Sequence, residues 1–227
     1  ILWLFIGAWI ISPLIASAGT IYKLLISWRV PTTWISALPT QGFVEVIGRI
    51  RFEPIMSLLK QSDCAYWQFE VKEYQSSGKG GGRWKTIHKQ SSGSFLIDDM
   101  TGRVQILVGN PSIITNNETV IEKPDAETKA FLENHGIKSK GFLGFDKRLR
   151  VYERLISPND EILILGKAQK NATPSTISGI DILPLVISNL SRAQTNKALL
   201  IQAVRPMIIP YLIGIGFLIF YLYIMYK

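Results

Sequence analysis

Basic side chains gather in two stretches of the sequence, and they have the greatest potential for binding chemistry. The first stretch surrounds a tryptophan and comprises Lys79, Arg83, Trp84, Lys85 and Lys89. The second comprises Lys147, Arg148 and Arg150. Close to a membrane, such charges attract anionic lipid headgroups, at about 1 kcal/mol for each Lys or Arg. Basic and aromatic residues also bind single-stranded nucleic acid, and a solvated basic face with no ligand explains the same pattern.

A second candidate is a polar stretch that follows the second basic one. Glu153, Arg154, Asp160 and Glu161 flank a Pro-Asn turn at positions 158–159. Together they could form a functional polar cluster, and an enzyme whose site is completed by a partner chain would use them. An ion pair that stabilises the fold beside the turn explains the same residues.

The remaining reactive side chains do not form a recognisable catalytic pattern. Asp98 and Asp99 could act as a carboxylate pair or bind Ca²⁺, but turn chemistry accounts for both. His88 and His135 have no third metal ligand nearby in the sequence, and Cys64 is the single cysteine. One cysteine forms neither an intramolecular disulfide nor a thiolate-rich zinc site. The sequence therefore predicts no catalytic residue, no cofactor and no metal site.

The two ends of the chain are strongly apolar. No charged side chain occurs in residues 1–22 or in residues 206–226, and an α-helix needs about 20 apolar residues to cross a bilayer. We therefore predict transmembrane helices at 1–27 and 206–226. An alternative interpretation of the first segment is a secretory signal, because residues 16–18, Ala-Ser-Ala, resemble a cleavage site. The basic residues that flank the spans on the domain side predict a cytoplasmic domain by the positive-inside rule.

Residues 44–190 read as one mainly β domain, which follows a linker at 28–43. Apolar residues alternate in several short runs, and turn residues separate these runs. The predicted strands cover residues 44–52, 65–74, 83–88, two within 94–108, 161–168 and 179–187. A helix is expected between Pro124 and Gly136, and a juxtamembrane helix at 191–205. The predicted fold is a membrane protein in which two transmembrane helices flank an OB-like barrel with one or two short helices.

Several ordered segments resemble a known domain family. The segments are VEVIGRIRF (44–52), CAYWQFEVKEY (64–74), GGRWKTI (81–87), FLIDDMTGRVQI (95–106) and RVYERLISPNDEILILGKA (150–168). Their order is similar to that of the GIDE, or "beside a membrane", domain of mitochondrial membrane-anchored RING ubiquitin ligases. The resemblance covers about residues 44–190, and the predicted flanking spans match the arrangement of those ligases.

The ligase activity does not follow from the resemblance. A RING binds two zinc ions, each through four Cys or His ligands, and this chain has one Cys and two His. Members without a RING resemble stand-alone prokaryotic membrane proteins, which implies a plasma-membrane location. The predicted function is a membrane-anchored, non-catalytic interaction or scaffold domain that binds a protein partner or the membrane surface. One alternative is an enzyme subunit whose site is completed by a partner chain. The other is an OB-like nucleic-acid binder, and nucleic acid is the less favoured partner.

Overall fold

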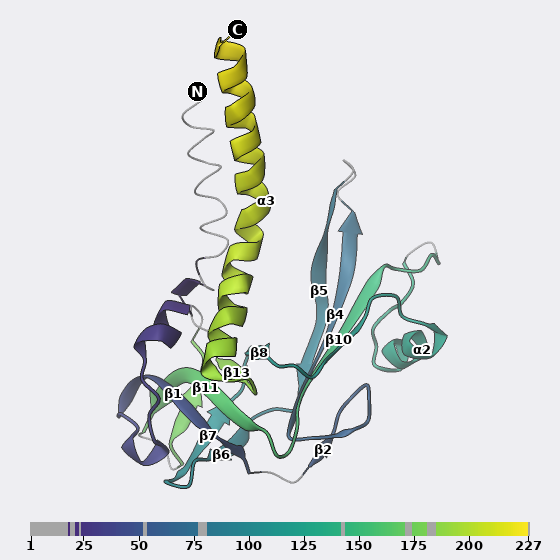
Figure 1. Ribbon diagram of the computed structural model, residues 1–227. Coiled ribbons are helices and arrows are strands. Elements are labelled where there is room, and N and C mark those ends of the chain that lie inside the picture. The colour runs from purple at the N-terminus through teal and green to yellow at the C-terminus, as the bar shows by residue number, and fades with distance from the viewer. Residues whose placement is uncertain are drawn as a thin grey trace.

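The computed structural model describes most of the chain. The described residues are 18, 21–22, 24–51, 54–76, 81–141, 144–170, 174–180 and 185–226. Within the last range, the side chains of 206, 207, 209, 210, 213–215, 217, 218, 220–222, 224 and 225 lie outside the description. The described elements form a barrel, a second sheet that leans away from it, and a long C-terminal helix that projects from the barrel (Figure 1).

The barrel is a closed cycle of five strands. In chain order these are β1 (Gln41–Ile50), β6 (Phe95–Asp98), β7 (Arg103–Leu107), β11 (Glu161–Gln169) and β12 (Thr176–Ser178). Around the cycle the order is β1-β6-β7-β12-β11, and β11 pairs antiparallel with β1 over nine residue pairs to close it. The contact between β7 and β12 is parallel, and the other contacts of the cycle are antiparallel. Closure leaves these strands without a free edge where they pair.

Side chains that alternate along the strands fill the barrel. Ile97, Val104, Ile106, Ile162 and Ile164 are completely buried and belong to one apolar cluster. Branched residues suit a pleated surface that is covered on one face. The barrel therefore has a packed core.

One glycine of β11 is required by the packing. A Cβ built on Gly166 would lie 2.7 Å from Ile177 Cγ2 and 2.9 Å from the carbonyl oxygen of Ser178. Both distances are shorter than real Cβ contacts. Only glycine allows β12 to approach β11 this closely.

Two short strands extend the barrel sheet towards the C-terminal helix. β13 (Val186–Ser188) pairs with β11, and β8 (Ser112–Ile114) pairs in parallel with β13. Helix α3 (Arg192–Tyr226) begins four residues after β13. Its Leu199 packs in one apolar cluster with Leu24 from the N-terminal helical residues 24–29.

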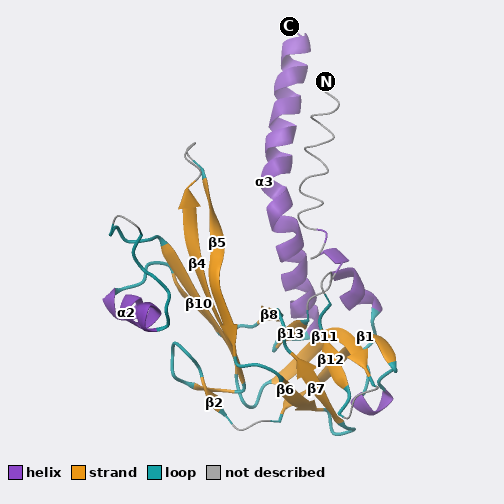
Figure 2. Cartoon of the chain, turned by 180° about the vertical axis from the view of Figure 1, so that it is seen from behind, coloured by secondary structure: helices purple, strands orange, loops and turns teal. Residues whose placement is uncertain are grey.

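The second sheet is built from two segments that leave the barrel. Its order is β5-β4-β10-β9, with β4 (Tyr66–Ser76), β5 (Gly82–Ser91), β9 (Glu118–Ile121) and β10 (Leu149–Ile156). β4 and β5 come from the chain between β1 and β6, whereas β9 and β10 come from the chain between β7 and β11. Helix α2 (Ala126–Asn134) lies beside this sheet (Figure 2). The smaller elements are η1 (Ile35–Ala37), β2 (Ile55–Met56) and β3 (Asp63–Cys64).

The mainly β composition and the barrel agree with the sequence prediction, and several details differ. The barrel resembles an OB-like barrel only weakly, because seven strands join its sheet and two long excursions of the chain build another sheet. The predicted strand at 179–187 is divided: β12 ends at Ser178, and β13 begins at Val186. Residues 191–205 and 206–226, predicted as a juxtamembrane helix that runs into a membrane span, lie in the single helix α3.

The prediction of two membrane-spanning helices is contradicted. In the part of the chain that the structure describes, no helix combines the length and the apolar character needed to cross a bilayer. The first half of α3 carries Arg192, Lys197 and Arg205, and the predicted span 1–27 falls largely outside the described residues. This finding contradicts the predicted integral two-span membrane partnership and the predicted plasma-membrane location.

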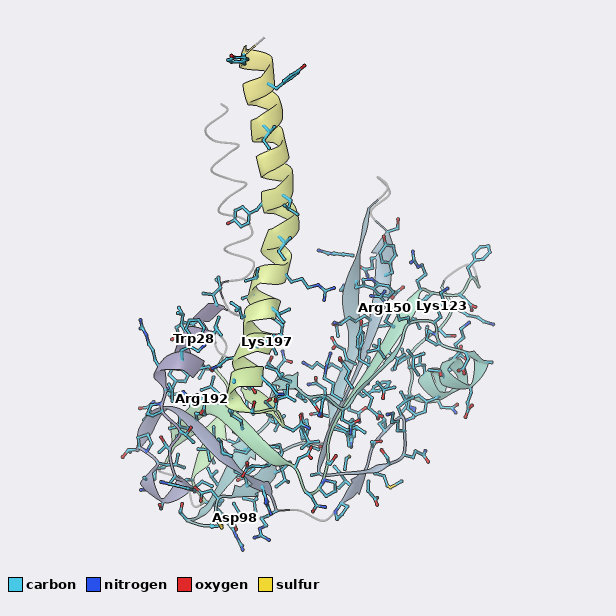
Figure 3. All side chains as sticks on the ribbon, in the orientation of Figure 1. Trp28, Asp98, Lys123, Arg150, Arg192 and Lys197 are labelled. Carbon is cyan, nitrogen blue, oxygen red and sulfur yellow. The ribbon has the colours of Figure 1, made fainter. Side chains whose placement is uncertain are left out.

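A buried carboxylate joins the barrel to α3. Glu45 of β1 is fully buried; its Oε1 accepts a hydrogen bond from Thr32 Oγ1 at 2.7 Å and lies 3.4 Å from Arg192 Nε. Arg192, at the base of α3 (Figure 3), also donates to the carbonyl oxygens of Ser27 at 2.9 Å and Val30 at 2.8 Å. One arginine thus connects the barrel, the N-terminal segment and α3.

Glu45 makes the stability of this junction depend on pH. Burial raises the pKa of Glu45 above its ordinary value, although the Thr32 hydrogen bond and the Arg192 charge act in the opposite direction. The folded chain then binds the proton more tightly than the unfolded chain. The stabilisation that Glu45 contributes is complete below its pKa in the unfolded chain. It is lost as the pH rises through its pKa in the folded chain.

We expect Glu45→Gln to remove this pH dependence, because the amide does not ionise. Chemical unfolding of both chains between about pH 4 and pH 8 measures the effect. The control is Glu161→Gln, which makes the same substitution at an exposed carboxylate on β11; the effect of Glu45→Gln on the slope should exceed that of the control. If the free energy of unfolding of the Glu45→Gln chain changed with pH as steeply as that of the unsubstituted chain, Glu45 would not be the source of the pH dependence.

Candidate functional site

The second sheet has one apolar face and one polar face. Side chains at Trp67, Phe69 and Val71 of β4 pack in the apolar cluster that includes Leu132 of α2. The residues between them point to the other face, because successive side chains of a strand alternate. This polar face has residues from four strands, which lie opposite one another in the strand registers. They are Gln68, Glu70, Lys72 and Tyr74 of β4, Arg150, Tyr152 and Arg154 of β10, Trp84, Thr86 and Lys89 of β5, and Glu118 of β9.

Glu70 lies at the centre of the polar face. Its Oε1 accepts a hydrogen bond from Thr86 Oγ1 at 2.7 Å and lies 3.5 Å from Lys72 Nζ. Its Oε2 lies 3.3 Å from Arg154 Nη1. Burial raises the pKa of Glu70, but the Thr86 hydrogen bond and the charges of Lys72 and Arg154 outweigh it, so the net pKa lies below the ordinary value. Glu70 is therefore ionised and held in place.

Arg154 links three strands across this face. Its Nη1 donates to Gln68 Oε1 at 3.3 Å, and its Nη2 lies 2.6 Å from Glu118 Oε1. Arg154 belongs to β10, Gln68 and Glu70 to β4, and Glu118 to β9. A planar guanidinium with several fixed donors suits such a multiple contact. Arg154 therefore fixes the relative positions of these strands.

Arginine–aromatic pairs continue the face towards the free end of the β4–β5 hairpin. Arg148 lies over the ring of Tyr74 at 4.5 Å, and Arg150 lies over the ring of Trp84 at 4.3 Å. The two rings meet edge to face, with centroids 5.4 Å apart. Arg150 also pairs with Glu122 at 3.0 Å. The stacking holds both guanidinium groups in defined positions on an accessible surface, because a cation is attracted to a ring face.

The fold brings the two basic stretches of the sequence together, but on both faces of the sheet. Trp84 and Lys89 lie on the polar face. Arg83 and Lys85 lie on the opposite side of β5, and Lys147 pairs with Glu73 at 3.2 Å. Arg148 and Arg150 stack on the β4–β5 hairpin, which links the second basic stretch to the first. The remaining member, Lys79, lies outside the described residues.

The fold separates the residues of the polar stretch, Glu153, Arg154, Asp160 and Glu161. Glu153 is fully buried on the apolar side of the sheet, where its carboxylate accepts the N–H groups of Leu59 at 2.7 Å and Lys60 at 3.1 Å. Arg154 points to the polar face. Adjacent residues of a strand point to opposite faces, so Glu153 and Arg154 do not share a site.

The other two members of that stretch also lie apart. Asp160 accepts hydrogen bonds from Ser157 N at 3.1 Å and Asn189 Nδ2 at 2.8 Å. Glu161 is exposed at the start of β11, opposite Arg49 of β1. These contacts form a turn and a strand end, and they do not converge on a cavity.

The Asp98–Asp99 pair is used by the turn between β6 and β7. One carboxylate oxygen of Asp99 accepts the N–H groups of Thr101 at 2.9 Å and Gly102 at 3.1 Å, and the other accepts Ile35 N at 2.6 Å. Asp98 accepts Met100 N at 2.8 Å. Among the described residues, no group of three or more His, Cys, Asp or Glu side chains could hold a metal ion.

The central residues of the polar face were not predicted as site residues from the sequence. Gln68, Glu70, Lys72 and Glu118 carry it, and none was singled out there. The alternation within WQFEVKEY indicates that Gln68, Glu70 and Lys72 share one face. It does not show that β10 and β9 supply Arg154 and Glu118 opposite them.

Comparisons with protein families, curated proteins and solved structures found no match. The site must therefore be interpreted from its own geometry. The resemblance to the GIDE domain remains a prediction.

Arg154 and Arg150 provide a matched pair for testing the network. Arg154→Ala should lower the free energy of unfolding by about 2 kcal/mol, because it removes one of the two cations beside the mostly buried Glu70 carboxylate and the contacts that join β10 to β4 and β9. Arg150→Ala should cost less than about 1 kcal/mol, because its ion pair is exposed. Urea unfolding measures both. Equal losses would contradict the assignment of Arg154 as the residue that holds the strands together.

Cys64 should be unreactive in the folded chain. Its thiol is buried and donates to the Ile55 carbonyl oxygen at 3.3 Å. Burial, together with the Glu153 and Asp63 charges, raises the pKa of Cys64 to about 11. A thiol reagent near neutral pH should therefore label the chain only after unfolding, because the thiolate is the reactive form. Rapid labelling of the folded chain, detected by mass spectrometry, would contradict this assignment.

Proposed function

We propose that this chain is a non-catalytic interaction domain that binds a protein partner through the polar face of its second sheet. The observation that carries the proposal is the pair of stacked arginines, Arg148 on Tyr74 and Arg150 on Trp84. Arginine and aromatic side chains are enriched among the residues that dominate protein–protein binding energy. Here they are already held in position before a partner binds, which lowers the entropy lost on binding.

The chemistry of the face supports binding better than catalysis. Its one buried carboxylate, Glu70, is ionised and held by Thr86, Lys72 and Arg154. A general base needs access to a substrate proton and a pKa near the working pH. Glu70 meets neither condition, so it serves as a fixed centre for the surrounding cations.

The same face suits a protein better than a nucleic acid. Arginines cover one side of each of the Tyr74 and Trp84 rings, whereas single-strand binders use aromatic rings to stack bases. Glu118 and Glu122 lie among the arginines and would repel phosphates. Mixed charge with aromatic anchors is typical of protein interfaces. The proposal keeps the non-catalytic interaction role that was predicted from the sequence.

Site-specific photocrosslinking tests the proposal in cells that express the full chain. Val120 of β9 lies opposite Tyr152 and is 44% exposed, so a photoreactive residue there should form a discrete adduct with one partner. The control position is Met100, which is 92% exposed in the barrel turn. Arg150→Glu should reduce the Val120 adduct about tenfold, because it reverses a central charge of the face. Adducts of equal yield at Met100, or a yield unaffected by Arg150→Glu, would contradict the proposal.

A further inference from the structure

β5 is the outermost strand of the second sheet (Figures 1 and 2). It runs for ten residues and pairs with β4 on one side, and no described strand pairs with its other side. A free strand edge presents unpaired backbone N–H and C=O groups to an incoming chain. Strand addition to such an edge is a recurring mode of peptide recognition.

The register identifies which residues present these groups. Tyr74 donates its backbone N–H to the carbonyl oxygen of Arg148 at 2.9 Å, on the side of β4 that faces β10. Its backbone groups therefore point away from β5. Trp84 lies opposite Tyr74, and Thr86 lies opposite Lys72, two residues earlier in β4. In an antiparallel pair, residues opposite such positions turn their own N–H and C=O outwards, so Trp84 and Thr86 offer theirs at the free edge.

The side chains of β5 define what can pair there. Arg83 and Lys85 are exposed on one face of the strand, and an opposite charge directly across a ladder is stabilising, whereas a like charge is destabilising. On the other face, Trp84 and Thr86 favour β-branched or aromatic neighbours. An acceptable strand therefore alternates acidic and β-branched residues.

A second copy of this chain does not meet that condition. Antiparallel pairing of two β5 strands would place the basic residues of one copy close to those of the other. The register of β5 against β4 also shifts between Val71 and Lys72, and bulges and edge lysines discourage unselective pairing. The β5 edge thus disfavours basic strands, including the β5 strand of a second copy, and accepts acidic strands.

We propose that β5 binds an extended acidic segment of the protein partner by strand addition along Gly82–Thr86. This inference rests on the proposed function and assigns it a binding mode. Backbone hydrogen bonds from Trp84 and Thr86 supply affinity, and Arg83 and Lys85 supply selectivity. The stacked arginines on the polar face then contact the remainder of the partner.

The probe for this edge is a fluorescent octapeptide of alternating glutamate and valine, titrated into the full chain and followed by anisotropy. Thr86→Pro removes an outward N–H and should weaken binding about tenfold or more. Thr86→Val is the matched control: it keeps the N–H and loses only the hydroxyl bond to Glu70, so it should weaken binding much less than Thr86→Pro does. Equal binding by the two variants overturns the proposal.

Two further measurements keep the test decisive if Thr86→Pro does not fold. Hydrogen exchange of the unsubstituted chain should slow in Gly82–Ser91 when the peptide binds, and slowing confined to other segments overturns the proposal. The double variant Arg83→Glu with Lys85→Glu should reverse the preference, so that a lysine–valine octapeptide binds more tightly than the glutamate–valine one. An unchanged preference also overturns it.

The crosslinking assay separates this inference from the proposed function. A partner adduct at Val120 that is lost in Thr86→Pro and kept in Thr86→Val supports strand addition. An adduct that persists unchanged in Thr86→Pro overturns strand addition and leaves the interaction role intact. Failure of the proposed function has a different signature, in which the Val120 adduct does not depend on Arg150.

Discussion

The antiparallel ladder between β4 and β10 is the interaction on which the second sheet depends. It joins eight residue pairs, from Tyr66 opposite Ile156 to Glu73 opposite Leu149. Each strand belongs to a different excursion from the barrel, so neither excursion forms the sheet alone. An isolated two-stranded hairpin is marginally stable in water. The ladder joins the β4–β5 hairpin and the β9–β10 pair into one sheet with a buried face.

The two faces of that ladder have different consequences. On the apolar face, Phe69 and Val71 pack with Leu132 of α2, and this burial supplies most of the driving force for docking the two excursions. On the polar face, Arg154 reaches from β10 to β4 and β9 and fixes how the strands align. The arginine–aromatic pairs project from this fixed base. A surface that binds a partner is thus built directly on the contacts that hold the sheet together.

Local sequence patterns predicted several strands but missed β8, β9 and β10, and they did not predict the arrangement. Alternation identified the β4–β5 hairpin, and turn residues identified the β6–β7 connection at Asp98–Gly102. The pairing of β4 with β10 joins residues that are 76 to 90 positions apart in the sequence, and alternation does not specify a partner at that distance.

The same limitation affected the candidate site and the ends of the chain. Glu153 and Arg154 were grouped because they are adjacent, although adjacency in a strand separates side chains. The apolar ends were interpreted as membrane spans from their composition alone. In the described residues that interpretation fails, because no helix there meets the requirements for crossing a bilayer. Composition does not show how a segment is placed in the fold.

The central claim is that the second sheet, and not the barrel, is the binding surface. Hydrogen exchange of the full chain, compared with and without its crosslinked partner, tests this most directly. The account predicts slower exchange in β4, β5 and β9, with no change in β6 and β7 of the barrel. Slower exchange confined to β6, β7 and the turn that joins them would contradict it.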